Sequence, residues 1–244
     1  MQESTKMTQG TSINRTGMST SAHAKAMEEV PGMTHPARYD GELGRARAVY
    51  LKETHALGTI PPPTTFKGAA KAAAQLLKGN KAIALVDKMA ERLAFERTGV
   101  RLYDALIEKL AVSGSFEGGP SHDELVTIRD EELAHAHMLV GTLEALGADP
   151  TAVTPSADLA GMEAQGIGSV LSDPRTTVGQ GLHALLVAEL ADHENWTLLR
   201  GLAEDMDQDD LARAMQQAEK DEERHLERVR AWVKAYAKEQ AELL

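Results

Sequence analysis

The sequence DEELAHAHM, residues 130–138, contains a glutamate and a histidine three positions apart, Glu132 and His135. A second stretch, DEERHLERV at residues 221–229, contains the same pair as Glu222 and His225. Residues three apart on a helix lie on one face, within about 5–6 Å of each other, so each pair could bind one metal ion. A single Glu-x-x-His arises by chance in glutamate-rich helices, and its meaning depends on whether the two copies are related.

The two pairs lie at matching positions of an internal repeat. The glutamates are 90 residues apart, and the histidines are separated by the same 90 residues. Apolar residues downstream match at this offset too: Leu139 with Val229, Leu143 with Val233, and Leu146 with Tyr236. The repeat therefore predicts that both pairs lie on buried helix faces, where a charged side chain needs a partner or a metal ion.

A long helix predicted over residues 81–111 supplies a further carboxylate. Its apolar residues recur at intervals of three, four or seven, which is the pattern of one helix face. Glu96 fills the position at which this apolar stripe skips a turn. Tyr103 follows seven residues later and is expected in the core, where it can also hydrogen-bond to a metal-binding carboxylate. We therefore predict Glu96 as a ligand.

A helix predicted over residues 177–204 offers two candidate carboxylates. Glu189 continues the apolar stripe, and Trp196 follows it at the same seven-residue spacing as in the first helix. Glu194 lies about 140° further round the helix and is the alternative ligand if the helix is rotated. We predict Glu189. His193 shares its face and either binds metal, hydrogen-bonds to a ligand, or packs near the core.

The order of the elements predicts an all-α fold. A helix capped by Ser121 and Glu124 extends to Leu146, and another follows residues 205–210 to the end of the sequence. Between the helix pairs, residues 148–175 contain three prolines and can cross the bundle, with a short helix near residues 157–172. Bundles with one long crossover include the ferritin-like folds, although an ordinary bundle has an equivalent order.

Composition narrows the function classes. The 244 residues include 26 Lys and Arg against 37 Asp and Glu, a net charge of −11 that argues against a nucleic-acid partner. The absence of cysteine excludes thiolate sites and iron–sulfur clusters, leaving oxygen and imidazole donors, which suit iron, manganese or zinc. No apolar run resembles a signal peptide or a membrane span, so no membrane partner is expected and the cytoplasm is the expected location.

The chain is expected to contain two regions. Residues 1–80 are predicted to form an N-terminal arm, partly flexible, with short helices between Gly41 and Gly58 and over residues 68–79. Residues 81–244 are predicted to form the four-helix bundle. The length of the arm is compatible with packing on the bundle or with contacting another subunit, as in a homodimer.

The six candidate ligands place a glutamate on each of two helices and a Glu-x-x-His on each of the other two: Glu96, Glu132, His135, Glu189, Glu222 and His225. This pattern, over residues 81–241, resembles the ferritin-like di-iron carboxylate superfamily, which includes bacterioferritins, rubrerythrins and manganese catalases. The resemblance implies a site for two metal ions. It favours iron, with manganese as the alternative, because both ions accept oxygen and nitrogen donors.

The resemblance also implies oxidase or ferroxidase chemistry, in which O₂ or peroxide oxidises Fe²⁺ or a small substrate. Manganese-catalase-like disproportionation of peroxide and a non-enzymatic, metal-binding or structural bundle are the alternatives. No catalytic side chain or organic cofactor is predicted beyond the metal ligands. A deep apolar pocket beside the ligands would favour an organic substrate, and a polar path to them would favour Fe²⁺ or peroxide.

Overall fold

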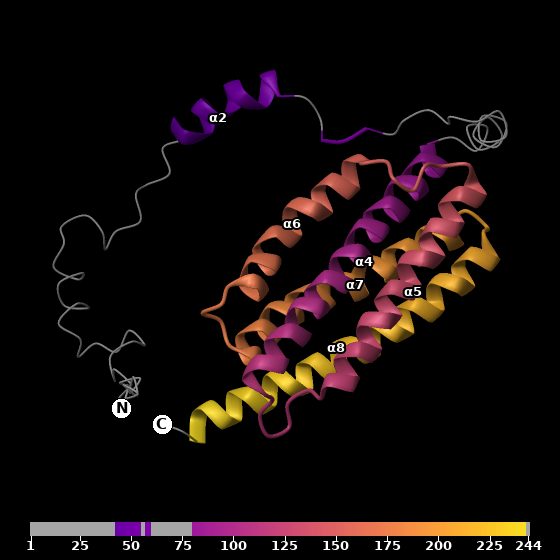
Figure 1. The fold of residues 1–244 in the computed structure, drawn as a ribbon. Coiled ribbons are helices and arrows are strands. Elements are labelled where there is room, and N and C mark those ends of the chain that lie inside the picture. Colours follow the sequence, from indigo (N-terminus) through magenta and orange to yellow (C-terminus); the bar gives the residue numbers. More distant parts are fainter. Residues whose placement is uncertain (1–41, 55–56, 60–79, 243–244) are drawn as a thin grey trace, which may run out of the picture. The chain divides into compact units, whose positions relative to one another are not determined.

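A computed structural model describes residues 42–54, 57–59 and 80–242 (Figure 1). These residues form helices and connecting turns with no strand among them, which confirms the all-α class. The chain divides into two units, residues 1–55 and 56–244. The first contains α2 (Glu42–Glu53), the short helix expected between Gly41 and Gly58. Residues 1–41 of the predicted N-terminal arm and the helix predicted over residues 68–79 lie outside the described residues.

The second unit contains five described helices. They are α4 (Asn80–Ser113), α5 (His122–Leu146), α6 (Pro155–Ser172), α7 (Val178–Glu204) and α8 (Asp209–Glu242). The four long ones match the four long helices predicted, and α6 is the short helix expected in the crossover. In the part of the chain that the structure describes, no helix combines the length and apolar character needed to cross a membrane.

Local sequence sets the helix ends. Ser121 accepts a hydrogen bond from the Glu124 backbone while the Glu124 side chain accepts one from the Ser121 backbone, so α5 begins with the predicted capping box. Thr177 and Gln180 form a second capping box at the start of α7. Helix α5 ends at Gly147, whose φ of 82° lies in the left-handed region that favours glycine.

The helices of this unit pack lengthwise against one another. Helix α4 contacts α5, α6 and α7, α7 packs against α8, and α5 meets α8 (Figure 1). Helix α6 packs on both α4 and α7. Asp87 on α4 accepts hydrogen bonds from the backbone N–H and the hydroxyl of Ser156 at 3.0 and 2.7 Å, which attaches the first turn of α6 to α4.

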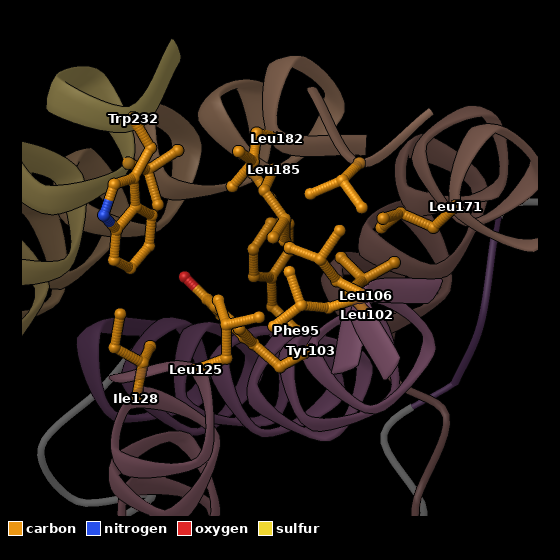
Figure 2. Close-up of a cluster of buried hydrophobic side chains, with 14 of the residues drawn as sticks. Phe95, Leu102, Tyr103, Leu106, Leu125, Ile128, Leu171, Leu182, Leu185 and Trp232 are labelled. Carbon is orange, nitrogen blue, oxygen red and sulfur yellow. The ribbon is translucent and has the colours of Figure 1, made fainter. Parts of the chain in front are cut away.

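Two clusters of buried apolar side chains hold these helices together. The first apolar cluster includes Phe95, Leu102, Leu106, Leu125, Ile128, Leu182, Leu185, Val229 and Trp232 (Figure 2). The second apolar cluster includes Leu85, Met89, Leu93, Leu139, Leu143, Trp196, Leu199 and Met215. Helices α4 and α8 run from the second cluster to the first, and α5 and α7 run the opposite way. Each long helix therefore crosses the layer between the clusters near its middle.

Candidate metal centre

A layer of acidic and histidine side chains lies between the two apolar clusters. All six residues predicted as ligands belong to this layer, and none is more than 7% exposed. Burial of this degree removes the simplest alternative for the two Glu-x-x-His pairs, which is a solvated charge on a helix surface. An ionised carboxylate in such a position is stable only with a compensating positive charge or hydrogen bonds.

The potential ligand atoms of this layer form three overlapping groups, within each of which all atoms lie within 4.8 Å of one another. One group contains Glu96, His135 and Glu222. A second contains Glu132, Glu189, Glu222 and His225. A third contains Glu96, Glu132, Asp192 and Glu222. Glu222 belongs to all three groups, and Glu96 and Glu132 belong to two each, so Glu222 lies at the centre of the layer.

The structure distinguishes the two candidate carboxylates of α7. Glu189 is 2% exposed and lies within the layer, whereas Glu194 is exposed at the surface. The rotation of α7 is set by its buried apolar residues, which turn Glu189 inward. His193 is partly buried and belongs to none of the three groups.

Sequence reasoning missed two charged residues of the site. Asp192 on α7 is 3% exposed and shares a group with Glu96. Arg92 on α4 is 1% exposed, and its Nη1 donates hydrogen bonds to the side chain and, at 3.4 Å, to the backbone carbonyl of Asp192. Asp192 lies three residues after Glu189 and Arg92 four residues before Glu96. Residues three or four apart share a helix face, so these spacings could have predicted that Asp192 and Arg92 lie on the same faces as the candidate ligands Glu189 and Glu96.

Both candidate ligand histidines turn Nδ1 toward the centre of the layer. His135 Nδ1 lies 2.8 Å from Glu222 Oε1 and 3.4 Å from Glu96 Oε2. His225 Nδ1 lies 3.2 Å from Glu222 Oε2 and 3.4 Å from Glu132 Oε1. Each imidazole therefore presents one nitrogen to the space between the carboxylates, as a metal ligand does.

The other nitrogen of each histidine faces a carboxylate of the opposite helix. His225 Nε2 lies 2.7 Å from Glu131 Oε2 on α5, and His135 Nε2 lies 3.5 Å from Asp221 Oδ2 on α8. Arg224 joins the two outer carboxylates, since it donates to Glu131 Oε1 at 2.8 Å and also to Asp221. Carboxylates in this position orient metal-binding imidazoles and place the proton on the nitrogen away from the metal.

The two aromatic residues predicted in the core bind carboxylates across the site. The buried hydroxyl of Tyr103 on α4 donates to Glu189 Oε1 on α7. Trp196 on α7 donates its indole N–H to Glu96 Oε1 on α4 at 2.8 Å. Each aromatic residue thus contacts the glutamate of the other helix, and not the glutamate seven residues before it. These bonds hold one oxygen of each carboxylate and leave the other directed elsewhere.

Several buried atoms of the layer have no hydrogen-bond partner. They include three carboxylate oxygens, Glu96 Oε2, Glu132 Oε2 and Glu189 Oε2, and Nε and Nη2 of Arg92. Glu222 Oε1 and His135 Nδ1 contact each other at 2.8 Å. Buried polar atoms in folded proteins are nearly always paired, so three unpaired carboxylate oxygens beside this contact indicate a place that is suited to bind a cation. Oxygen and imidazole nitrogen at these separations match the donors that iron, manganese and zinc accept.

The pKa shifts of the residues in the layer also support a cation-binding site. Burial, together with repulsion from Glu222 and Glu96, raises the pKa of Glu132 well above its usual value. Burial and the charge of Glu222 raise the pKa of Glu189 to about 8. Burial opposes protonation of His135, but the neighbouring Glu222 and Glu96 outweigh it and raise the pKa of His135 to about 10. Burial opposes ionisation of Glu222, but the neighbouring His135 and His225 outweigh it and lower the pKa of Glu222 to about 2. Without a metal ion, Glu132 and Glu189 therefore favour their protonated forms while Glu222 stays ionised beside the two histidines.

Comparisons of the chain with models of protein families, with characterised proteins and with solved structures found no match. The assignment of the layer as a candidate metal centre therefore rests on its own residues. Burial, unpaired carboxylate oxygens and the direction of both Nδ1 atoms fit a divalent metal ion.

Proposed function

We propose that this protein is a ferritin-like four-helix bundle that binds two metal ions and uses O₂ or peroxide in oxidase or ferroxidase chemistry. Iron is the proposed metal and manganese the alternative. The observation that carries the proposal is the set of unpaired carboxylate oxygens on Glu96, Glu132 and Glu189, which lie among the six buried candidate ligands between two apolar clusters. A site that only stabilised the fold would be expected to pair these atoms within the protein.

The arrangement of the helices supports a ferritin-like bundle. Helices α4 and α8 run in one direction, α5 and α7 run in the other, and the crossover between α5 and α7 contains α6. A connection of this length between two parallel helices is the feature that distinguishes bundles with one crossover from simple up-and-down bundles. The ligands come from all four long helices, so the site depends on this arrangement.

The grouping of donor atoms suggests how two ions would be held. One ion would bind Glu96, His135 and Glu222, and the other Glu189, His225, Glu132 and Glu222. Glu222, which belongs to both groups, could be a ligand of either ion. The four glutamates carry a charge of about −4 when ionised, which matches two divalent cations if the imidazoles are neutral.

A bound pair of iron ions would supply electrons to O₂ or peroxide, and the residues of this chain determine what reaches the site. The apolar clusters exclude water from both ends of the layer. Glu131 and Asp221 hold the histidines in the orientation that leaves Nδ1 free for the metal. Tyr103 and Trp196 restrain Glu189 and Glu96 through one oxygen each.

A surface pocket between α5 and α8 gives a small reactant access to His225. It has a volume of about 570 Å³ and is lined by charged side chains, which include Glu131, Arg224 and Arg228, and by the apolar Ile128 and Trp232. This mixed lining is compatible with Fe²⁺, peroxide or a small organic substrate.

Metal analysis of the purified full-length protein tests the proposal. Protein from iron-replete and manganese-replete cells is expected to contain close to two ions per chain, to lose them in Glu132→Ala and Glu222→Ala, and to consume O₂ or peroxide when reduced. The Glu194→Ala variant, which removes an exposed carboxylate of α7, is the matched control and should retain both ions. Wild-type protein that binds neither metal in the presence of excess Fe²⁺ or Mn²⁺ would show that the proposal is wrong.

A further inference from the structure

The layer of acidic and histidine side chains contains corresponding residues on the two helix pairs. Glu96 and Tyr103 on α4 correspond to Glu189 and Trp196 on α7 at a constant offset of 93 residues. Each aromatic residue binds the glutamate of the other helix, and each ligand histidine faces the outer carboxylate of the opposite helix. In these contacts, the surroundings of the two proposed ions are equivalent.

The equivalence fails at two pairs of positions. At the same offset, Asp192 on α7 corresponds to Gly99 on α4, and Arg92 corresponds to Leu185. A Cβ atom at Gly99 would lie 2.2 Å from Glu132 Oε2, so the carboxylate of Glu132 occupies the space that a side chain would fill there. Asp192 instead contributes a carboxylate of its own, which makes one half of the layer richer in oxygen donors.

Asp192 faces the centre of the layer and not only its ion-pair partner. One of its oxygens lies within 4.8 Å of carboxylate oxygens of Glu96, Glu132 and Glu222. Two of those neighbours have oxygens without a hydrogen-bond partner, Glu96 Oε2 and Glu132 Oε2. Four buried carboxylates at such distances repel one another, and the guanidinium of Arg92 pairs directly with Asp192 alone. A cation between the carboxylates would relieve the repulsion.

We propose that Asp192 is a seventh metal ligand, bound to the ion nearest Glu96 and His135, and that Arg92 holds its carboxylate in place when no ion is present. The proposal rests on the two-ion site proposed above. Five carboxylates and one guanidinium give the layer a net charge of about −4, which keeps the balance with two divalent ions. The ion beside Asp192 has an additional oxygen donor, so the two ions bind with unequal affinity.

Titration of the full-length, metal-free protein with Co²⁺ tests this inference. Wild-type protein is expected to bind two ions, the first at least about tenfold more tightly than the second, a difference of the size that groups around a metal produce. In Asp192→Asn the affinity for one ion should fall by about tenfold or more, with a change in the visible absorption of that ion, which depends on its ligands. The other ion should bind as in wild type. Glu194→Gln removes the same charge from the surface of α7 and should change neither ion.

A double variant separates coordination from charge. Arg92→Met with Asp192→Asn removes one positive and one negative charge, so the layer keeps the net charge of the wild type, and replacement of a buried ion pair in this way is tolerated by many folds. If Asp192 is a ligand, the double variant still binds one ion with the lowered affinity and still shows the altered spectrum of that ion. Recovery of wild-type affinity and spectrum would show that Asp192 only neutralises Arg92, and the inference would be wrong.

Two other outcomes are decisive. Wild-type affinities for both ions in Asp192→Asn would overturn the role of Asp192 while leaving the two-ion site intact. Wild-type protein that binds no Co²⁺, Fe²⁺ or Mn²⁺ would overturn the two-ion site and this inference together. Thermal unfolding of each metal-free variant verifies that the variant is folded, so that a loss of metal binding does not reflect unfolding.

Discussion

Glu131 on α5 and His225 on α8 lie 2.7 Å apart, carboxylate oxygen to imidazole Nε2. Glu131 directly precedes the candidate ligand Glu132, which shares a group of potential ligand atoms with His225, so adjacent residues of α5 face the same part of the site. Asp221, directly before Glu222, faces His135 in the same way at 3.5 Å. The residue before each Glu-x-x-His thus orients the histidine of the other copy, and the two copies depend on each other.

Removal of the Glu131 carboxylate is expected to weaken metal binding. In Glu131→Ala the His225 ring loses the group that fixes its orientation and its proton, and such losses typically reduce metal affinity by about 10–100-fold. Isothermal titration with Mn²⁺ measures the change. Glu223→Ala, an exposed glutamate on α8, is the matched control. Equal affinities in the two variants would contradict the role of Glu131.

A methyl group at position 99 is expected to displace Glu132. The Cβ of Gly99→Ala would lie 2.2 Å from Glu132 Oε2, far inside van der Waals contact, so the carboxylate must move. We expect fewer than two ions per chain by metal analysis. Gly141→Ala on α5 meets no atom within 4 Å and should raise the free energy of unfolding by about 0.5–1 kcal/mol, as alanine does in helices. Retention of both ions in Gly99→Ala would show that Glu132 can bind metal from another position.

Loss of the Tyr103 hydroxyl is expected to destabilise the metal-free protein. Tyr103→Phe leaves Glu189 Oε1 without its buried donor while Oε2 already has none, and loss of a buried hydrogen bond to a carboxylate costs roughly 1–3 kcal/mol. Urea denaturation measures the free energy of unfolding. Tyr236→Phe removes a more exposed hydroxyl, 3.0 Å from Thr177 Oγ1, and should cost less. A larger loss in Tyr236→Phe would argue against the importance of the buried bond.

The attachment of α6 to α4 is expected to depend on pH. Burial acts to raise the pKa of Asp87, but hydrogen bonds from Thr154 and Ser156 outweigh it and lower the pKa below the ordinary value. A lowered pKa in the folded state means that the carboxylate stabilises the fold above its unfolded pKa of about 3.9 and loses this effect as the pH falls through the folded value. The difference in unfolding free energy between wild type and Asp87→Asn should therefore shrink from pH 6 to pH 3.

A matched surface variant controls for general effects of acid. Glu163→Gln on α6 removes an exposed carboxylate from the same helix. Its unfolding free energy should follow that of the wild type over this range. A difference between wild type and Asp87→Asn that stays constant with pH would show that the Asp87 charge does not contribute.

The sequence by itself determined the helices and much of the site. Helix periodicity and capping depend on residues three or four apart, so the capping box at Ser121 and the end of α5 at Gly147 were predictable. The 90-residue repeat placed both Glu-x-x-His pairs on buried faces for the same reason. Glu96 was found because it interrupts an apolar stripe. The metal, the reaction and the role of residues 1–80 stay predictions.

Only the tertiary structure decided how the helices face one another. The choice between Glu189 and Glu194 depends on the rotation of α7, which packing against its neighbours sets. Asp192 and Arg92 are 100 residues apart, and their pairing exists only where α4 meets α7. The contacts of Tyr103 with Glu189 and of Glu131 with His225 likewise join different helices. Helical spacing shows which face of its own helix a residue occupies, and the fold determines which residue stands opposite.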